Sequence, residues 1–316
     1  MKAIAGVIAL AAATVCGLAD ANAQTYPARP INMIVPFPPG GNTDIMARAL
    51  QNEISKALGQ TVVIINKGGA AGTLGLIDLA RAAPDGYSVA LTPNNPLTAQ
   101  PHVQKLPYGM DSFRYICLTY YAPYVLIAGP QAPFKTFAEF VTFAKAKSEN
   151  LIYGHPGLAS QPHLGMLTVL KAIGADGLGV PFTGAGPMAQ ALLSGTVMAI
   201  AETPAVAAAS NLPILAALSE ARIAALPDVR TMKELGYPAT SFTAGGVIAP
   251  GSTPSAVVAT LEKACADATA RPEYKTIADR LNVEARYLPG DAFRKLFDAD
   301  SVENADAVKG AGLGAK

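Results

Sequence analysis

The chain has 316 residues and a formal net charge of +1, with 51% hydrophobic and 15% charged residues. This composition excludes an intrinsically disordered chain, and the even spread of charge disfavours a nucleic-acid-binding protein, which needs a clustered basic face. Because single hydrophobic cores tend to split above about 250 residues, we expect two domains.

The N-terminus has the pattern of a secretory signal peptide. Lys2 is followed by an uncharged apolar run from Ala3 to Ala13, which is shorter than the roughly 20 residues of a membrane-spanning helix. Small residues at Ala21 and Ala23 predict cleavage after Ala23, so that the mature chain begins at Gln24. We therefore expect a soluble protein in the periplasm.

Short apolar runs alternate with helical stretches from residue 31 onward, and glycines and prolines separate them. The predicted strands are 31–35, 61–65, 87–92, 124–128, 151–153, 179–182, 197–201, 213–218 and 244–249. The predicted helices are 43–58, 137–147, 162–173, 187–194, 231–235, 255–270, 274–281 and 292–309. A further helix is predicted after the glycine-rich turn 68–75 and ends near residue 83. Helix 43–58 places Met46, Leu50, Ile54 and Leu58 on one face. The alternation of strands and helices predicts an α/β chain with parallel sheets flanked by helices.

Two cysteines, Cys117 and Cys265, remain after the predicted cleavage. In an oxidising compartment they could pair, but a separation in sequence gives no distance in space. Because unpaired cysteine is among the most buried residue types, we expect two buried free thiols.

The most distinctive local pattern is the segment from Pro36 to Asp44, where a strand ends, the chain turns and a helix begins. The first N–H groups of a helix have no partner inside the helix, and its dipole is positive there, so such a turn can bind an anion. Gly40 and Gly41 allow the backbone to approach a ligand closely. An ordinary strand-to-helix turn with its own caps explains the spacing equally well.

Three further loops have the same construction. Segments 69–75, 157–160 and 183–186 each contain glycine and precede a predicted helix, and Pro187 suits the first helical position of the last. In open α/β sheets the binding crevice lies outside the carboxyl ends of the strands, so these loops can border one cleft. Their N–H groups can hold a carboxylate without a charged side chain.

Gly184 to Ala189 match the alanine variant of the dinucleotide-binding fingerprint, and Glu202 ends the next predicted strand, near the place of a ribose-binding acid. A secreted oxidoreductase is therefore an alternative to a binding protein, although Pro187 is unusual inside this motif. The chain has neither the G-x-x-x-x-G-K-[ST] phosphate loop nor the G-x-S-x-G motif of hydrolases.

Ser160 and His163 lie three residues apart at a predicted helix start. A helix cap and a first-turn polar residue explain this spacing, and we expect one of the two to contact a ligand rather than to act in catalysis. The three histidines, His102, His155 and His163, do not have the spacing of a zinc site.

Several other polar and aromatic residues follow predicted strands. We expect Phe37 in the cleft because its turn offers little to bury it, whereas Tyr153 and Phe182 could line the cleft or belong to the core. Asn94 and Asn95 follow the third predicted strand, and their amides could offer donors and acceptors to the far end of a ligand.

The ordered set of motifs resembles the Bug family, the periplasmic solute-binding receptors of tripartite tricarboxylate transporters. No single motif carries this resemblance, which covers nearly the whole mature chain. In chain order its segments are 26–31, 35–44, 58–60, 66–75, 83–87, 157–164, 180–184, 226–229 and 249–254.

The resemblance implies an α/β, two-domain, periplasmic-binding-protein-like fold, each domain a mainly parallel sheet flanked by helices, with a cleft between the domains. It implies a small carboxylate ligand, such as a dicarboxylate, a tricarboxylate, an amino acid or an aromatic acid. Together with the patterns above, it gives sixteen expected ligand-binding residues, which are Phe37, Pro39, Gly40, Gly41, Asn42, Thr43, Asp44, Asn94, Asn95, Ser160, His163, Phe182, Thr183, Gly184, Ala185 and Glu202.

The chain departs from the family pattern at several positions. Gly68 stands where proline is usual, and Ala71 and Ala159 stand where glycine is usual. Thr183 occupies a position that is frequently lysine or another polar residue, and Glu202 one that is usually aspartate. Arg230 also stands where proline is usual. Most of these positions border the expected cleft, so they bear on the choice of ligand.

We therefore expect a signal peptide at 1–23, a first domain formed by 24–122 and 241–290, a second formed by 123–240, and a C-terminal helix, 291–316, packed on one of them. The expected function is capture of a small carboxylate by domain closure and its delivery to the membrane components of a tripartite transporter. We expect a monomer without cofactor, metal, catalytic residues or nucleic-acid partner. A secreted enzyme and a carboxylate sensor are the alternatives.

Overall fold

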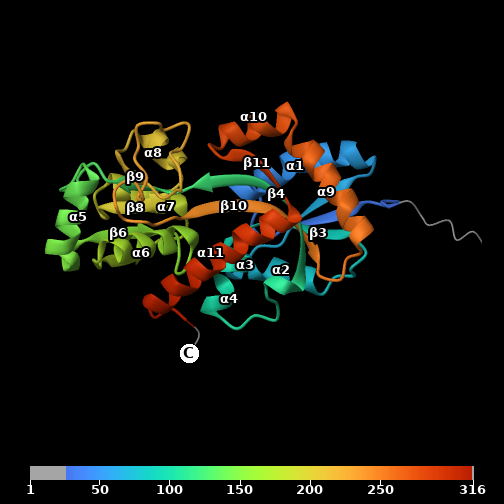
Figure 1. Cartoon of the computed structure of the whole chain (residues 1–316), viewed down its shortest axis with the longest axis horizontal. Helices are drawn as coiled ribbons and strands as arrows, with labels where there is room; N and C mark the ends of the chain where they lie inside the picture. Colours follow the sequence, from blue (N-terminus) through green and yellow to red (C-terminus); the bar gives the residue numbers. More distant parts are fainter. Residues whose placement is uncertain (1–25, 315–316) are drawn as a thin grey trace, which may run out of the picture.

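The computed structural model describes residues 26–314, which contain two β-sheets lying next to each other along the long axis of the molecule (Figure 1). The predicted signal peptide and its cleavage site lie outside these residues. Within the described range, no helix combines the length and the apolar character needed to cross a membrane.

The first sheet has six strands and is mixed. In spatial order the strands are β11 (Glu284–Pro289), β4 (Phe113–Pro123), β10 (Phe242–Pro250), β3 (Ser88–Pro93), β1 (Ile31–Val35) and β2 (Val62–Asn66). Strand β1 pairs in parallel with β2 and β3, whereas β10 runs antiparallel to β3 and β4, and β11 antiparallel to β4.

The second sheet has five strands and is also mixed. In spatial order they are β7 (Leu178–Pro181), β6 (Ile152–His155), β8 (Ala199–Glu202), β5 (Val125–Ala128) and β9 (Ile214–Ala217). Strand β6 is parallel to β7 and β8, and β5 is antiparallel to β8 and β9. The α/β fold with two sheets is thus confirmed. The prediction of mainly parallel sheets is wrong, because β10 and β5, which lie next to the crossings, pair antiparallel with their neighbours.

The chain passes between the two sheets twice, at neighbouring points. Strand β4 ends at Pro123 and β5 begins at Val125, while the return passes through Ser241 into β10. The backbone N–H of Tyr124 donates to the carbonyl oxygen of Ser241 at 2.8 Å, and the N–H of Ser241 donates to that of Leu218 at 2.9 Å. The two crossing segments are therefore hydrogen-bonded to each other, and they run side by side between the sheets in Figure 1.

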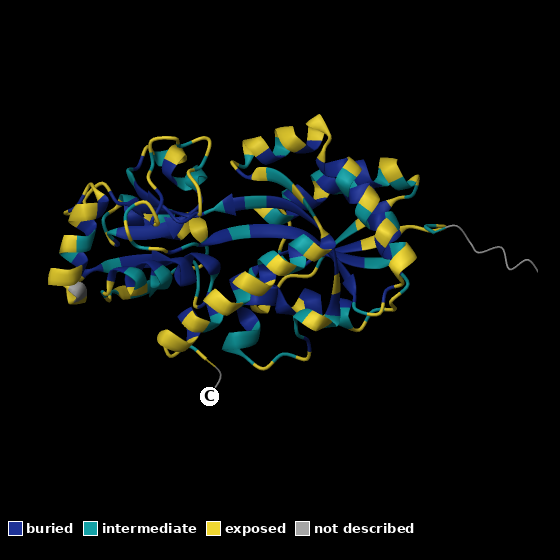
Figure 2. Cartoon of the chain, in the orientation of Figure 1, coloured by how far each residue is buried: buried dark blue, intermediate teal, exposed yellow. Residues whose placement is uncertain are grey.

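Helices cover the sheets, and the outer faces of these helices are exposed to solvent (Figure 2). The α-helices are α1 (Asn42–Leu58), α2 (Thr73–Ala80), α3 (Asn95–Thr98), α4 (Gln100–Val103), α5 (Phe137–Ala146), α6 (Gln161–Ile173), α7 (Ala185–Leu193), α8 (Pro204–Ser210), α9 (Ser255–Thr269), α10 (Pro272–Arg280) and α11 (Gly290–Gly310). Short 3-10 turns are η1 (Ala70–Gly72), η2 (Met110–Ser112) and η3 (Ser148–Asn150).

Each sheet carries an apolar cluster on both of its faces. On the first sheet, α1, α9 and α10 share one cluster, and α2 and α11 share the other. On the second sheet, α5 and α6 cover one face, and α7 and α8 the other. The predicted apolar face of α1 is confirmed, because Met46, Leu50 and Ile54 are buried and Leu58 packs against the same cluster.

Helix α11 contacts elements associated with both sheets. Phe293 and Phe297 near its start belong to a cluster of the first sheet, whereas Ala307 and Val308 near its end pack against Leu164 of α6. The C-terminal helix therefore contacts both halves of the molecule, whereas the sequence predicts packing on one domain. It lies beside the crossing strands and extends towards α6 (Figure 1).

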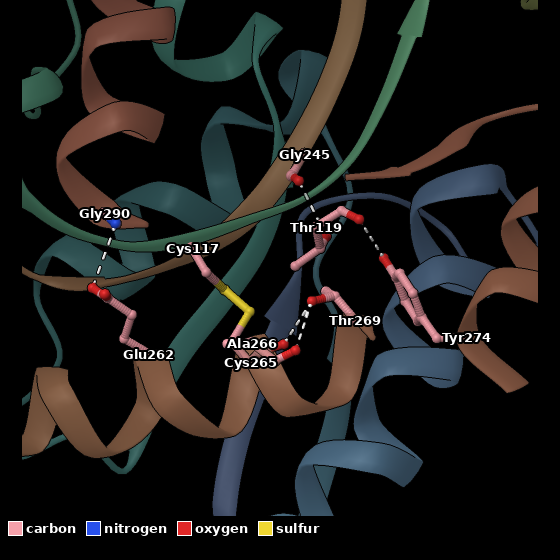
Figure 3. Close-up of a disulfide and its surroundings, with 9 residues drawn as sticks. All are labelled: Cys117, Thr119, Gly245, Glu262, Cys265, Ala266, Thr269, Tyr274 and Gly290. Atoms are coloured by element: carbon pink, nitrogen blue, oxygen red, sulfur yellow. Dashed lines mark hydrogen bonds between the residues drawn. A yellow bond between two sulfur atoms is a disulfide. The ribbon is translucent and has the colours of Figure 1, made fainter. Parts of the chain in front are cut away.

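A disulfide joins Cys117 of β4 to Cys265 of α9, so the expectation of two free thiols is wrong (Figure 3). The two Cα atoms are 6.5 Å apart although the residues are separated by 148 positions. Helix α9 packs directly on β4, and this packing brings the cysteines together. Both cysteines are fully buried, as predicted, but as a covalent cross-link inside the core.

Some elements differ from the prediction. Strands β4 and β11 and helices α3, α4 and α8 were not predicted, and residues 231–235 form turns instead of the predicted helix. Thr231 and Glu234 bond reciprocally: the N–H of Thr231 donates to the Glu234 carboxylate at 2.8 Å, and the N–H of Glu234 to Thr231 Oγ1 at 3.1 Å. Gly236 follows with a φ of 87°, which ends the turn before a helix can extend.

Candidate ligand-binding site

The loops predicted to bind a ligand follow the carboxyl ends of β1, β2 and β3 in one sheet and of β6, β7 and β8 in the other. The two sets of loops meet at Asn95, whose side-chain Nδ2 donates to the carbonyl oxygen of Ala159 at 3.0 Å. Asn95 follows β3, and Ala159 lies in the loop after β6. This bond joins loops from the two sheets at residues that are 64 positions apart in the sequence.

The loop after β1 is held by the carboxylate of Asp44 in the first turn of α1. Asp44 Oδ2 accepts from the backbone N–H of Gly40 at 2.9 Å and from Arg48 Nε at 3.0 Å, and Oδ1 accepts from Asn66 Nδ2 at 2.9 Å. Asn66 Nδ2 also donates to the carbonyl oxygen of Phe37 at 3.0 Å. Asp44, which we predicted to contact ligand, therefore engages both carboxylate oxygens in shaping the loop.

The electrostatics of Asp44 agree with this role. Burial acts to raise its pKa, but the hydrogen bonds from Arg48, Gly40 and Asn66 outweigh burial and hold the pKa below the ordinary aspartate value. The carboxylate is consequently ionised at neutral pH, and its charge is compensated by Arg48.

The tip of the same loop is open. Pro39, Gly40, Gly41 and Asn42 are exposed, and Thr43 is half-buried. Gly41 precedes α1 in an extended conformation (φ −79°, ψ 165°), and no side chain in the described range caps the helix from that position. The first N–H groups of α1 are therefore available to an anion, as the sequence predicted.

Phe37 lies against the loop that follows β2. A Cβ at Gly72 would come within 3.1 Å of the Phe37 ring and 2.8 Å of the Pro96 side chain, and Gly72 has a φ of 89°. Only glycine fits this close approach. Ala70 and Ala71 beside it have φ values of 47° and 55°, so two alanines adopt the left-handed conformation in this loop.

Asn94 does not offer its side chain to a ligand. It is 1% exposed, and its Nδ2 donates to Asp300 Oδ2 at 2.9 Å and to the carbonyl oxygen of Phe242 at 3.2 Å. Its Oδ1 accepts from the N–H of Ala244. Asn94 is thus part of a buried polar network, and its amide is bonded within the protein in this structure.

Asn95 is likewise engaged. In addition to its bond with Ala159, its Oδ1 accepts from Gln100 Nε2 at 3.2 Å. Its role in this conformation is to connect the two sets of loops.

On the second sheet, the carboxyl ends of the three parallel strands place His155, Phe182 and Glu202 at one edge. His155 ends β6, and its carbonyl oxygen accepts from the N–H of Phe182 at 2.9 Å. Thr183 and Ala185 are exposed, and Gly184 before α7 has a φ of 121°, a conformation that favours glycine. The N-terminus of α7 is therefore open next to this edge.

Ser160 and His163 lie at the start of α6. Ser160 caps the helix, since its Oγ accepts from the N–H of His163 at 3.4 Å. His163 is only 5% exposed and stacks on His155, with ring centroids 3.9 Å apart. The sequence predicts a ligand contact for Ser160 or His163 but not for His155, because no local pattern pairs the two histidines.

Glu202 ends β8 next to the crossing strands. It is 8% exposed, and its Oε1 accepts from the N–H of Thr203 at 2.7 Å. Burial raises the pKa of Glu202 to about 7, although the hydrogen bonds from Thr203 act to lower it. Burial, together with the charge of Glu202, raises the pKa of Tyr124, whose hydroxyl bonds to Thr243. Glu202 therefore lies close to the junction of the two sheets.

Sequence comparison then identifies the family. Residues 46–313 match the sequence profile of TctC, described as "Tripartite tricarboxylate transporter family receptor". The chain belongs to this family.

Relatives of the TctC family match nearly the whole chain. BugT of Bordetella pertussis (strain Tohama I) is 37% identical over 275 residues, which are 83% of each protein. A TctC solute-binding protein from Polaromonas, solved without ligand, superposes with a TM-score of 0.81 at 32% identity, covering 90% of this chain and 99% of that one. MatC of Rhodopseudomonas palustris, solved with bound malate, superposes with a TM-score of 0.76 at 30% identity, covering 90% and 100%.

TctC proteins are binding proteins, so the chain is not an enzyme, and the dinucleotide-dependent oxidoreductase is excluded as an alternative. The topology gives the physical reason. Gly184 precedes α7 and Gly186 lies in its first turn, but β6 lies between β7 and β8, so Glu202 does not end a strand adjacent to the glycine loop. The dinucleotide fingerprint needs its acid on the neighbouring strand.

Proposed function

We propose that this TctC-family protein captures a small carboxylate between its two halves and delivers it to the membrane components of a tripartite transporter. The observation that supports this most directly is the meeting of two sets of strand-end loops at the bond between Asn95 and Ala159. Open helix N-termini, at Gly41 and at Gly184, belong to opposite sets and can both donate N–H groups to an anion.

The proposed ligand contacts are the exposed loop residues together with the polar and aromatic residues at the strand ends. They are Phe37, Pro39, Gly40, Gly41, Asn42, Thr43, Ser160, His163, Phe182, Thr183, Gly184, Ala185 and Glu202. Asp44, Asn94 and Asn95 support the loops instead of meeting the ligand, since their polar atoms are bonded within the protein. The malate in MatC is a carboxylate of the size that such loops could enclose.

The proposed domains are residues 24–122 with 241–290, and residues 123–240, hinged at the paired crossing segments near Tyr124 and Ser241. The long helix α11 touches both. A ligand closes such a protein only as far as it binds the closed state more tightly than the open state. The loops of the second domain would complete the anion shell on closure, and the closed form would be recognised by the transporter.

The compartment fits this role. The TctC family is one of periplasmic binding proteins. We propose that residues 1–23 are a signal peptide, that cleavage follows Ala23, and that the exported protein acts as a monomer without cofactor.

A thermal-shift panel of carboxylates tests the proposal. Citrate-like acids, C4 dicarboxylates, amino acids and aromatic acids would each be added to the protein at millimolar concentration. A ligand present at about 100 times its Kd adds roughly 2.7 kcal/mol to the free energy of unfolding, which is readily seen as a higher melting temperature. If no acid in the panel raises the melting temperature, the proposed function is wrong.

A further inference from the structure

His155 and His163 form a stacked pair at the carboxyl end of β6. Their ring centroids are 3.9 Å apart and the ring planes are 12° from parallel. His155 is the last residue of β6, and His163 lies in the first turn of α6. The two residues are 2% and 5% exposed, so the pair is almost completely enclosed at the edge of the candidate site.

The loop between the two residues fixes the tautomer of each ring. His155 Nδ1 lies 2.8 Å from the carbonyl oxygen of Gly157, and because a carbonyl only accepts, this nitrogen carries the proton. The N–H of Ala159 donates to His163 Nδ1 at 3.0 Å, so this nitrogen carries none. In the neutral rings, Nε2 of His155 is therefore an acceptor and Nε2 of His163 is a donor.

The neutral state is the one that the surroundings favour. Burial lowers the pKa of His163 to about 4, with a further lowering from the neighbouring His155. Burial also lowers the pKa of His155, although its bond to Gly157 opposes this. Both rings are therefore uncharged at neutral pH, and the assignment of one donor and one acceptor holds there.

Both Nε2 atoms are free to meet a ligand. Because both Nδ1 atoms bond to the backbone of residues 157–159 and the rings are nearly parallel, the Nε2 atoms lie on the edges turned away from that loop. Neither Nε2 atom has a hydrogen-bond partner within residues 26–314. Within that range, the side-chain polar atom that is both fully enclosed and without a partner is Tyr115 Oη, so neither Nε2 atom is fully enclosed. The two Nε2 atoms therefore reach accessible space and present a donor and an acceptor side by side.

We propose that this pair selects carboxylates that carry a hydroxyl group on the carbon next to the carboxylate, an inference that rests on the proposed function. His163 Nε2–H donates to a carboxylate oxygen of the ligand, and His155 Nε2 accepts from the ligand hydroxyl. An acid without the hydroxyl places a C–H group against the buried acceptor and leaves it unpaired, which weakens binding. His155 is then a specificity-determining residue for the bound acid.

The test compares acids that differ only by the hydroxyl group, with malate against succinate and citrate against tricarballylate. Isothermal titration calorimetry on the exported protein measures the affinity for each acid. In the pair that binds, the hydroxylated acid should bind about 10-fold more tightly than the plain acid. His155→Phe keeps an aromatic ring for stacking but removes the acceptor, so its preference should fall to within about 2-fold, because neither acid then meets an unpaired acceptor. The control is His102→Phe, because His102 bonds to Ser301 and lies outside the candidate site.

Different results overturn different statements. If the wild-type protein binds the plain acid as tightly as its hydroxylated partner, the selection by His155 is wrong and the proposed function stands. If no acid binds, the proposed function fails and the inference fails with it. A preference that persists in folded His155→Phe also overturns the inference. Should that variant not fold, His155→Leu repeats the comparison with a smaller apolar side chain, and the same loss of preference is required.

Discussion

Asn94 and Asp300, which are 206 residues apart, are joined by a hydrogen bond of 2.9 Å in the buried interior. The same carboxylate accepts from Thr98 Oγ1 at 2.6 Å and from Gln161 Nε2 at 3.2 Å. Thr98 belongs to α3, Gln161 to α6 and Asp300 to α11. One buried side chain therefore holds three helices together directly behind the point where the two sets of loops meet.

Asp300→Ala should destabilise the protein strongly. The substitution removes one acceptor from each of Asn94, Thr98 and Gln161, and the loss of such a buried network is expected to cost about 2–4 kcal/mol in the free energy of unfolding. Urea denaturation measures this value. Asp298→Ala on the same helix is the matched control, since the Asp298 carboxylate is half-exposed and only pairs with Arg294, so it should cost less than about 1 kcal/mol. Equal losses in the two variants would contradict the role assigned to Asp300.

Removing the disulfide should lower stability without changing the fold. The cross-link closes a loop of 148 residues, and the loss of such a link typically costs about 2–4 kcal/mol, largely because the unfolded chain gains freedom. The double variant Cys117→Ala/Cys265→Ala should melt at a lower temperature than the oxidised protein. A reductant should lower the melting temperature of the wild type and leave that of the double variant unchanged. A wild type that is insensitive to complete reduction would contradict this prediction.

Local sequence patterns predicted the elements that depend on neighbours along the chain. Helix α1 has its boundaries and its buried face where the spacing of Met46, Leu50 and Ile54 placed them, because period and caps are local. The loop after β1 was also predicted as an open helix N-terminus, since a strand, a glycine pair and a helix follow one another there. These features need no knowledge of the rest of the fold.

Features that depend on distant contacts were missed. No local pattern encodes the pairing of Cys117 with Cys265 or of Asn94 with Asp300, since each needs two segments to be packed together first. The apolar strand β4 was not predicted at all, because it depends on pairing with β10 and β11. Local sequence patterns therefore predict the backbone loops of the candidate site, but not the distant side-chain contacts that support them.

Ligand affinity should depend on pH through Glu202. Burial raises its pKa to about 7, so the side chain is uncharged below that pH and becomes an anion above it. An anionic ligand is repelled only by the ionised form, so affinity should fall by roughly 10-fold as pH rises through 7. The same raised pKa means that its contribution to folding stability is full below the unfolded value of 4.5 and is lost as pH rises through about 7. Calorimetric titrations from acidic to alkaline pH measure the affinity. Glu202→Gln should give a flat profile, and a fall that persists in this variant would remove Glu202 from the site.

Replacing Ala71 with glycine should not destabilise the protein, whereas the same replacement inside a helix should. Its φ of 55° is a left-handed conformation that costs an alanine about 1–2 kcal/mol, which exceeds the entropy that glycine loses on folding. Ala71→Gly should therefore leave the free energy of unfolding unchanged or raise it by up to about 1 kcal/mol. Ala259→Gly, at an exposed position inside α9, should lower it by about 1 kcal/mol. Denaturant titrations should thus show a loss of stability in Ala259→Gly but none in Ala71→Gly, and a similar loss in both would contradict the strain at Ala71.

Gly41→Val should abolish ligand binding while the protein still folds. Gly41 has a φ of −79° and a ψ of 165°, which valine adopts without strain, and the nearest atom to a Cβ there is the carbonyl oxygen of Pro38 at 3.9 Å. The branched side chain would occupy the space in front of the first N–H groups of α1, so affinity should fall by about 100-fold or more. The free energy of unfolding should change by less than about 1 kcal/mol. Gly109→Val is the matched control, since it also adds valine at an extended glycine with open space, at the start of η2 outside the site. Unchanged affinity in a folded Gly41→Val protein would exclude the loop after β1 from the binding site, whereas loss of binding in Gly109→Val as well would point to a general effect of the added side chain.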